Sequence, residues 1–362
     1  MSVRDEIGPA KTAFVFAGGG SFGAIQVGML QSLTAHGVAA DMVVGSSVGA
    51  LNGAFYAGDP TLDGVQRLAE IWRGLKRYDV FPMSWHTVLS FLWRRDFLIS
   101  HDGIRKLIED HIPYRNLEEA KLPVHIVTTD IVTGDSVVLS QGSTAEAIVA
   151  STAIPGAFSP IRYKDRYLAD GAISSNTPIQ VAVKQGARRL IILPTGHACA
   201  NQTPPVGAVA NALHALTLMI ARQLVSELEA LAPDIEYFVV PPLCPLVGSP
   251  YDFSRTADHI DRAILSTDVW LARHGLQQGK IPHEMRLHKH RAAAAGTLRC
   301  TAKVLGRKRK YSCHPLSHPR ATARISYGLA ALVGLSCRPA RIIWLRVLWK
   351  RCCCRSRHAS SS

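Results

Sequence analysis

A serine enclosed by glycines is the first feature of this sequence that could do chemistry. Gly45-Ser46-Ser47-Val48-Gly49 is a GxSxG sequence, a pattern that carries little weight alone. Its context is more informative, because an expected strand over residues 42–44 precedes it and an expected helix over residues 50–57 follows. A strand–turn–helix of this kind exposes a nucleophile, and the helix N-terminus behind it favours developing negative charge. We therefore take Ser47 as a candidate nucleophile; the alternative is a Gly/Ser-rich loop that only turns the chain.

A second glycine cluster also separates an expected strand from an expected helix. Gly18-Gly19-Gly20-Ser21-Phe22-Gly23 follows the apolar residues 13–17 and precedes a helical pattern over residues 24–36. As GxGxxG it could bind a dinucleotide, but that requires an acidic residue ending the second strand, and Asp41 stands before that strand. Neighbouring parallel strands end at one edge of a sheet, so we favour an oxyanion hole of glycine N–H groups beside Ser47. A non-catalytic phosphate cradle is the third interpretation.

The serine also needs a base. None of the nine histidines in residues 1–280 has a distinctive setting. Asp170-Gly171-Ala172 is more informative, because the small residues after Asp170 leave its carboxylate approachable. An Asp-Gly pair on its own is more often only a turn. Asp170 is nevertheless the better candidate for the base.

These three segments, in this order, resemble the glycine-rich, GxSxG and DGA/DGG motifs of the patatin-like phospholipases, in their bacterial type. Two further stretches, 129–134 and 150–155, resemble the strand-turn before the acidic motif and the approach to that motif. The likeness covers about residues 12–275. Phe22 departs from it, because many family members have Arg or Lys there.

The resemblance implies a catalytic dyad, with Ser47 as the nucleophile, Asp170 as the base and no histidine between them. It also implies an oxyanion hole of backbone amides, at Gly18, Gly19, Gly20 and Gly23, and motif positions at Gly45, Gly49, Gly171 and Ala172. An aspartate near its ordinary pKa of about 3.9 is a weak base at neutral pH, and burial beside Ser47 would strengthen it. Lipids, either phospholipids or simpler acylglycerols, are the substrates that the resemblance implies.

Short apolar runs that alternate with helical patterns predict an α/β fold. We expect a three-layer α/β/α sandwich of patatin type with a mainly parallel central sheet. Further strands are expected at 124–129, 136–139 and 189–193, and further helices at 145–151, 205–231 and 257–274. We place one acyl hydrolase domain at residues 1–280, with its core at about 12–275.

Residues 72–97 hold seven aromatic side chains: Trp72, Tyr78, Phe81, Trp85, Phe91, Trp93 and Phe97. They are interpreted either as a helical hairpin packed on the sheet or as a mobile apolar cap over a lipid site. Both interpretations could hold together.

The end of the chain has a different composition. Residues 281–362 contain 18 basic residues and one acidic residue, a net charge of +17, whereas residues 1–280, with 23 basic and 26 acidic residues, carry −3. The net +14 of the chain therefore gives no reason to expect a nucleic-acid partner for the body. The basic tail is either a poorly ordered appendage or a membrane contact, with an amphipathic segment over 341–350 and acylated cysteines at 352–354.

The cysteines, the apolar runs and the motifs also predict the compartment and the cofactor requirement. Two isolated cysteines in residues 1–280, Cys199 and Cys244, fit a reducing environment. We find no signal peptide and no run of about 20 apolar residues, so we expect a cytoplasmic protein, peripheral on the inner membrane face through the cap and tail. No motif demands a metal, so we expect no cofactor and no calcium dependence.

The sequence thus predicts a serine acyl hydrolase that cleaves lipid acyl esters, of phospholipase A, lysophospholipase or lipase type. Two alternatives remain at this point. One is an α/β-hydrolase esterase with a Ser-His-Asp triad, and the other is a non-catalytic lipid-binding module. A nicotinamide-dependent dehydrogenase is a distant third.

Overall fold

The computed structural model describes most of the first three quarters of the chain. The described residues are 11–80, 99–196, 208–246, 249–273, 275–276, 281–282, 285, 299–305 and 308–314. The chain divides into two units, Met1–Arg291 and Ala292–Ser362. The described part of the second unit is an antiparallel pair of strands, β9 (Arg299–Leu305) and β10 (Lys308–His314), which the sequence did not lead us to expect. The boundary near residue 280 stays a prediction, and the amphipathic and cysteine-rich segments of the tail lie outside the described residues.

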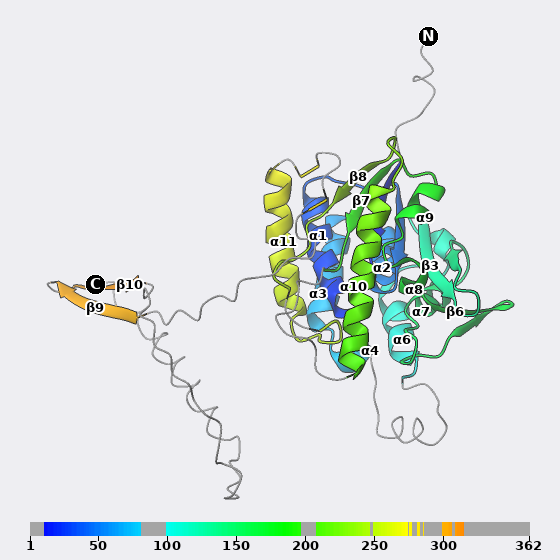
Figure 1. Cartoon of the computed structure of the whole chain (residues 1–362), viewed down its shortest axis with the longest axis horizontal. Helices are drawn as coiled ribbons and strands as arrows, with labels where there is room; N and C mark the ends of the chain where they lie inside the picture. Colours follow the sequence, from blue (N-terminus) through cyan, green and yellow to red (C-terminus); the bar gives the residue numbers. More distant parts are fainter. Residues whose placement is uncertain are drawn as a thin grey trace, which may run out of the picture. The chain divides into compact units, whose positions relative to one another are not determined.

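An eight-stranded mixed sheet forms the centre of the first unit (Figure 1). Its strands are β1 (Thr12–Phe16), β2 (Met42–Ser46), β3 (Val124–Asp130), β4 (Ser136–Leu139), β5 (Ile161–Tyr163), β6 (Arg166–Asp170), β7 (Arg189–Leu193) and β8 (Glu236–Val239). The order is β5-β6-β3-β2-β1-β7-β8, and β4 also pairs with β3. Strands β3, β2, β1, β7 and β8 are parallel, while β4, β5 and β6 add antiparallel pairs. The mainly parallel central sheet is confirmed.

Helices cover both faces of this sheet. They are α1 (Gly23–Ala35), α2 (Val48–Gly58), α3 (Leu62–Gly74), α4 (Arg77–Val80), α6 (Asp102–His111), α7 (Thr144–Ser151), α8 (Ala172–Ser175), α9 (Ile179–Lys184), α10 (Ala208–Glu229) and α11 (Thr256–Ala272), with 3-10 turns η2 (Gly20–Phe22) and η3 (Leu117–Glu119). The expected strands and helices at the two glycine motifs are therefore confirmed to within about two residues.

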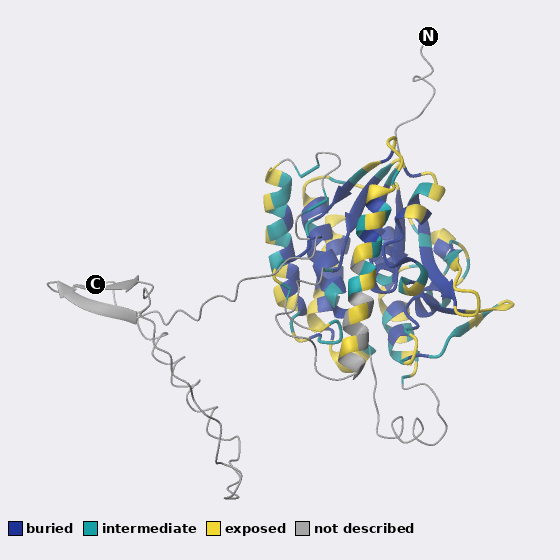
Figure 2. Ribbon diagram, viewed as in Figure 1, coloured by how far each residue is buried: buried dark blue, intermediate teal, exposed yellow. Residues whose placement is uncertain are grey.

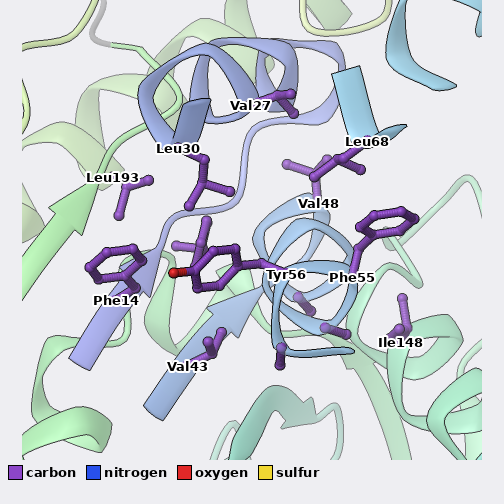
Figure 3. Close-up of a cluster of buried hydrophobic side chains, with 14 of the residues drawn as sticks. Phe14, Val27, Leu30, Val43, Val48, Phe55, Tyr56, Leu68, Ile148 and Leu193 are labelled. Carbon is purple, nitrogen blue, oxygen red and sulfur yellow. The ribbon is translucent and has the colours of Figure 1, made fainter. Parts of the chain in front are cut away.

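The alternation of side chains along β1 shows why the fold has three layers. Phe14 and Phe16 enter a core shared with α1, α2, α3, α7 and α11, whereas Ala13 and Val15 enter a second core shared with α9 and α10. In the first core the Phe14 ring stacks on the ring of Tyr56, with 5.5 Å between centroids (Figure 3). Because both faces are covered, the central strands β1, β2, β3 and β7 are almost entirely buried, as the dark blue centre of Figure 2 shows.

The aromatic segment is described only at its beginning. Trp72 lies on α3 and is 2% exposed, and Tyr78 lies on α4 and is 67% exposed. Residues 81–98, which contain the other five aromatic side chains of the expected cap, lie outside the described residues. In the part of the chain that the structure describes, no helix combines the length and apolar character that a membrane crossing requires.

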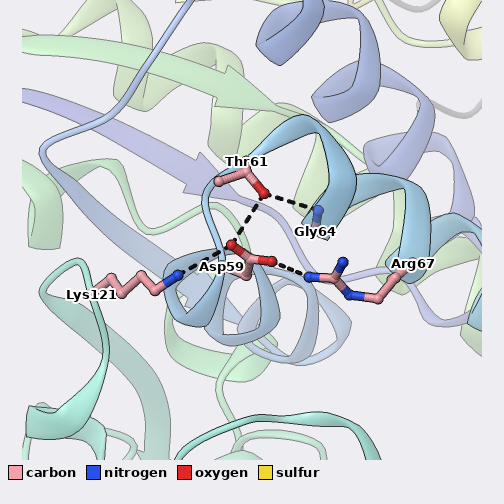
Figure 4. Close-up of polar contacts among 5 residues, drawn as sticks. All are labelled: Asp59, Thr61, Gly64, Arg67 and Lys121. Atoms are coloured by element: carbon pink, nitrogen blue, oxygen red, sulfur yellow. Dashed lines mark hydrogen bonds and ion pairs between the residues drawn. The ribbon is translucent and has the colours of Figure 1, made fainter.

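Asp59 joins the end of α2 to the beginning of α3 and to the segment before β3 (Figure 4). Its carboxylate pairs with Arg67 and accepts hydrogen bonds from Thr61 Oγ1 at 3.1 Å and Lys121 Nζ at 3.3 Å. Thr61 Oγ1 in turn caps α3 by accepting from Gly64 N at 3.1 Å. Partial burial alone would raise the pKa of Asp59, but Lys121, Thr61 and Arg67 together hold it below its ordinary value.

We expect Asp59→Ala to lower the free energy of unfolding by about 1–2 kcal/mol at neutral pH, because one carboxylate organises three partners. Chemical denaturation measures this. The folded pKa lies below the ordinary value of 3.8, so the stabilisation should be complete at neutral pH and disappear as pH falls below about 4. As a control, Asp261→Ala breaks the more exposed ion pair with Arg73 and should cost less than about 0.5 kcal/mol. Equal losses in the two variants would contradict the proposed role of Asp59.

Candidate active site

Ser47 occupies a sharp turn between β2 and α2. Its backbone has φ 53° and ψ −127°, a conformation that is strained for a residue with a side chain. The motif glycines allow this turn by close packing: a Cβ on Gly45 would lie 2.4 Å from Gly49 O, and a Cβ on Gly49 would lie 2.4 Å from Phe16 O. The GxSxG residues therefore form the strand–turn–helix that a nucleophile requires.

The hydroxyl of Ser47 is hydrogen-bonded to the carboxylate of Asp170. Ser47 Oγ donates to Asp170 Oδ2 at 2.7 Å, and Asp170 Oδ1 accepts from Ala172 N at 2.8 Å. The two residues are 7% and 4% exposed. Gly171 is required beside them, because a Cβ there would lie 2.1 Å from Val127 O. The structure thus brings together the two residues that the sequence nominated.

The register of the sheet explains this meeting. Residues 126 and 127 of β3 pair with β2 and with β4, so these two strands lie on opposite edges of β3. Residues 128 and 129 pair with β4 and with β6, so β6 lies on the same edge as β2. Ser46 is opposite Val127 and Asp170 is opposite Thr128, so β2 and β6 approach each other end to end. Ser47 and Asp170 stand where they meet.

The environment raises the basicity of Asp170. Burial raises its pKa from 3.8 to about 6, against the opposing effect of the hydrogen bonds from Ala172 and Ser47. Burial first, and then the charge of Asp170, also raise the pKa of Tyr251, which places this tyrosine within electrostatic reach of the carboxylate. An aspartate with a pKa of about 6 is mostly ionised at neutral pH and is a better proton acceptor than an exposed one.

Ser151 links the backbone of Ser47 to that of β3. Its Oγ accepts a hydrogen bond from Ser47 N at 2.9 Å and donates to Val127 O at 2.6 Å. The Ser47 amide is therefore engaged and does not point to a free acceptor site. Sequence reasoning did not assign a role to Ser151, although it lies in the 150–155 stretch that carried part of the resemblance.

The glycine-rich loop lies against Ser47: a Cβ on Gly18 would come within 3.2 Å of Ser47 Cβ. Two of its four expected oxyanion donors are engaged elsewhere, since Gly18 N donates to Asn176 O at 3.0 Å and Gly23 N donates to its own turn. Gly19 and Gly20 have φ values of 156° and 58°, which favour glycine, and their amides have no acceptor among the described residues. The structure therefore narrows the expected set to Gly19 and Gly20.

Residues far away in the sequence hold this loop. Thr195 Oγ1 donates to Gly18 O at 2.6 Å. On the other side, Ser21 N donates to Pro250 O at 2.7 Å and Ser21 Oγ donates to Ser249 O at 3.2 Å. None of these partners stands in a recognisable motif, so no sequence signal identified them.

The described histidines have other contacts. His101 bonds to Ser159 O at 2.9 Å, and His125 bonds to Ser140 Oγ at 2.7 Å. His259 packs against the ring of Phe22, with 5.7 Å between centroids. Within the described ranges no histidine is hydrogen-bonded to Ser47 or to its carboxylate partner, and no cluster of three His, Cys, Asp or Glu could hold a metal ion. Among the described side chains, the carboxylate of Asp170 is the group that bonds to the Ser47 hydroxyl.

Part of this chain is similar to known proteins. Residues 14–183 match the family model described as patatin-like phospholipase. The patatin-like phospholipase domain-containing protein 7 of Mus musculus is 30% identical over 186 residues, which cover 51% of this chain and 13% of that protein. An uncharacterized NTE family protein of Mycobacterium tuberculosis is 32% identical over 170 residues, 46% of this chain and 27% of its own length.

One more relative and one solved structure match parts of this chain. Lysophospholipase NTE1 of Scheffersomyces stipitis is 28% identical over 192 residues, 51% of this chain and 12% of the relative. The chain thus spans about an eighth to a quarter of the length of these relatives. VipD from Legionella pneumophila aligns in structure over 72% of this chain and 67% of its own, with a TM-score of 0.40 and 17% identity. Residues 14–183, which contain the glycine-rich loop, Ser47 and Asp170, form a domain of the patatin-like phospholipase family.

Proposed function

We propose that this chain is a serine acyl hydrolase that cleaves lipid acyl esters through Ser47 and Asp170. The observation that carries the proposal is the 2.7 Å hydrogen bond from Ser47 Oγ to a buried carboxylate whose pKa is raised to about 6. The family of residues 14–183 supports lipid esters, either phospholipids, lysophospholipids or acylglycerols, as the substrates.

The reaction proceeds in two acyl-transfer steps, and a proton is transferred in each. Ser47 Oγ attacks the ester carbonyl while its proton moves to Asp170 Oδ2, and the amides of Gly19 and Gly20 stabilise the oxyanion. Collapse of the tetrahedral intermediate expels the alcohol, which takes the proton from Asp170. Water then attacks the acyl-Ser47 ester with Asp170 as the base, and the carboxylic acid leaves as Ser47 regains its proton.

Membrane contact belongs to the same proposal, because lipid substrates are presented at a surface. Residues 72–97 and the basic tail are its candidate elements, and most of them lie outside the described residues. Peripheral contact and a cytoplasmic location therefore stay predictions.

The dyad predicts that Ser47→Ala and Asp170→Asn each lower kcat/KM for a short-chain p-nitrophenyl ester by about 10³-fold or more. Hydrolysis by the full chain is measured together with circular dichroism, so that folding is checked for each variant. Ser174→Ala is the matched control, since this hydroxyl lies four residues after Asp170 but bonds to Thr129, and it should retain most of the activity. Near-normal turnover by Asp170→Asn would mean that another residue is the base. A well-folded parent chain that hydrolyses neither this ester nor phospholipid would favour a lipid-binding module.

The pH dependence follows from the base. Because Asp170 must be ionised to accept the serine proton, kcat/KM should rise with pH through an apparent pKa of about 6 and then level off. A pH–rate profile of the parent chain from pH 4.5 to 8.5 measures this, on an ester stable over that range. A midpoint near 4 would contradict the burial of the base, and a midpoint near 7 would point to a histidine.

The same burial should cost stability. The folded pKa of about 6 lies above the ordinary 3.8, so between these values the folded chain keeps a proton that the unfolded chain has released. The contribution of Asp170 to stability therefore falls as pH rises from about 4 to 6 and is lowest above 6. Asp170→Asn, which stays neutral, should be more stable than the parent at pH 7.5 by up to ~3 kcal/mol, with no such gain at pH 4. Equal differences at both pH values, measured by urea denaturation, would contradict this.

A further inference from the structure

A chain of buried polar side chains crosses the first core beneath the glycine-rich loop. Trp72 Nε1 donates to Asn52 Oδ1 at 2.9 Å, and Asn52 Nδ2 donates to Gln26 Oε1 at 2.9 Å. Trp72 is 2% exposed, and Asn52 and Gln26 are fully buried. Polar groups at such depth are unfavourable unless every one is paired, and here they pair with one another across three helices.

The remaining N–H donors of these buried side chains bond to backbone carbonyls at the two ends of the glycine-rich loop. Gln26 Nε2 donates to Ala17 O at 2.8 Å, directly before Gly18, and also to Leu193 O at 2.8 Å. Asn52 Nδ2 donates to Gly23 O at 3.0 Å, directly after Phe22. The network therefore holds the loop at its entry and at its exit.

The same network is connected to the nucleophile. Asn52 lies on α2, whose first turn begins at Ser47: Leu51 N donates to Ser47 O at 3.4 Å. One rigid helix thus carries the turn that presents the nucleophile and the amide that holds the exit of the glycine loop. A shift of the loop relative to Ser47 would have to break a buried hydrogen bond.

Trp72 makes a second connection to the loop. Its ring stacks on Phe253, with 6.2 Å between centroids and 13° between planes. The chain just before Phe253 contains Pro250, whose carbonyl accepts from Ser21 N within the loop. A Cβ on Gly23 would lie 2.9 Å from the indole, so the loop exit packs directly on this side chain. Trp72 therefore supports the loop both through its N–H and through its ring.

We propose that Trp72, Asn52 and Gln26 are positioning residues. They hold the amides of Gly19 and Gly20 where these can donate hydrogen bonds to the oxyanion formed on Ser47. This inference rests on the proposed hydrolase function. The physical reason is that oxyanion donors act only when they are aligned before the reaction, and a misplacement of about 1 Å can cost about 10²-fold in rate. A loop with glycine at four of its six positions has little stiffness of its own, so its alignment has to come from its surroundings.

The test uses two variants of the full chain. Trp72→Phe removes the indole N–H and keeps an aromatic ring against Phe253, and Asn52→Asp keeps the acceptor for Trp72 but loses the donors to Gln26 and Gly23. We expect kcat for a short-chain p-nitrophenyl ester to fall about 10- to 100-fold, with KM changed less than about threefold, because the loop binds the transition state more than the substrate. The midpoint of the pH–rate profile should stay that of the parent, since Asp170 is untouched.

Tyr114→Phe is the matched control. It removes a partly buried hydrogen bond to the same helix, from Tyr114 Oη to Ala54 O at 2.7 Å, at a point away from the glycine loop. We expect it to lower the melting temperature while kcat stays within about twofold of the parent. The inference would be overturned if kcat fell no further in Trp72→Phe and Asn52→Asp than in Tyr114→Phe. The network would then serve stability alone.

Ser47→Ala separates this inference from the proposed function. If the parent chain hydrolyses the ester and Ser47→Ala does not, the hydrolase function holds and the two network variants alone decide the positioning role. If the folded parent hydrolyses no ester, the hydrolase function fails, and the inference falls with it.

Discussion

A buried carboxylate hydrogen-bonded to a serine hydroxyl is costly for a protein to maintain, and this chain maintains one at the junction of two strands. Asp170 is 4% exposed and lacks a cationic partner within the described residues; its hydrogen bonds come from Ser47 and Ala172. Desolvation, which makes the arrangement unfavourable for stability, also makes the aspartate basic enough to take a proton. The rest of the first unit holds these two side chains together and shields them from solvent.

The sheet supplies the position, and close backbone packing supplies the precision. β2 and β6 arrive at β3 from opposite directions along one edge, so the last residue of each faces the other. The glycines of the site allow contacts that any side chain would block: Gly171 lies against Val127, and Gly49 against Phe16. These glycines are needed for their missing Cβ atoms more than for conformational freedom. The exceptions are Gly19 and Gly20, whose backbone angles themselves favour glycine.

The polar interior and the apolar cores have different roles around this site. The Phe14–Tyr56 stack and its neighbours fix α1 and α2 on one face of the sheet, a task that apolar packing does without specifying exact alignment. The hydrogen bonds of Trp72, Asn52 and Gln26 depend on direction, so they can fix the position of the glycine-rich loop relative to α2. Packing and polar contacts together would give the pre-aligned site on which a rate enhancement depends.

The sequence by itself determined the local structure at each motif and the identity of the two central residues. Strand, glycine turn and helix follow one another closely enough along the chain that periodicity and glycine placement predicted them, and the resemblance to a family added the pairing of Ser47 with Asp170. Only the tertiary structure decided that the amides of Gly19 and Gly20 lack an acceptor among the described residues, whereas the amides of Gly18 and Gly23 are engaged by contacts that the motif does not reveal. It also decided the hydrogen bonds of Ser151, Thr195, Asn52 and Gln26. These residues act through single hydrogen bonds to distant backbone atoms, and such bonds leave no periodic or compositional trace in the sequence.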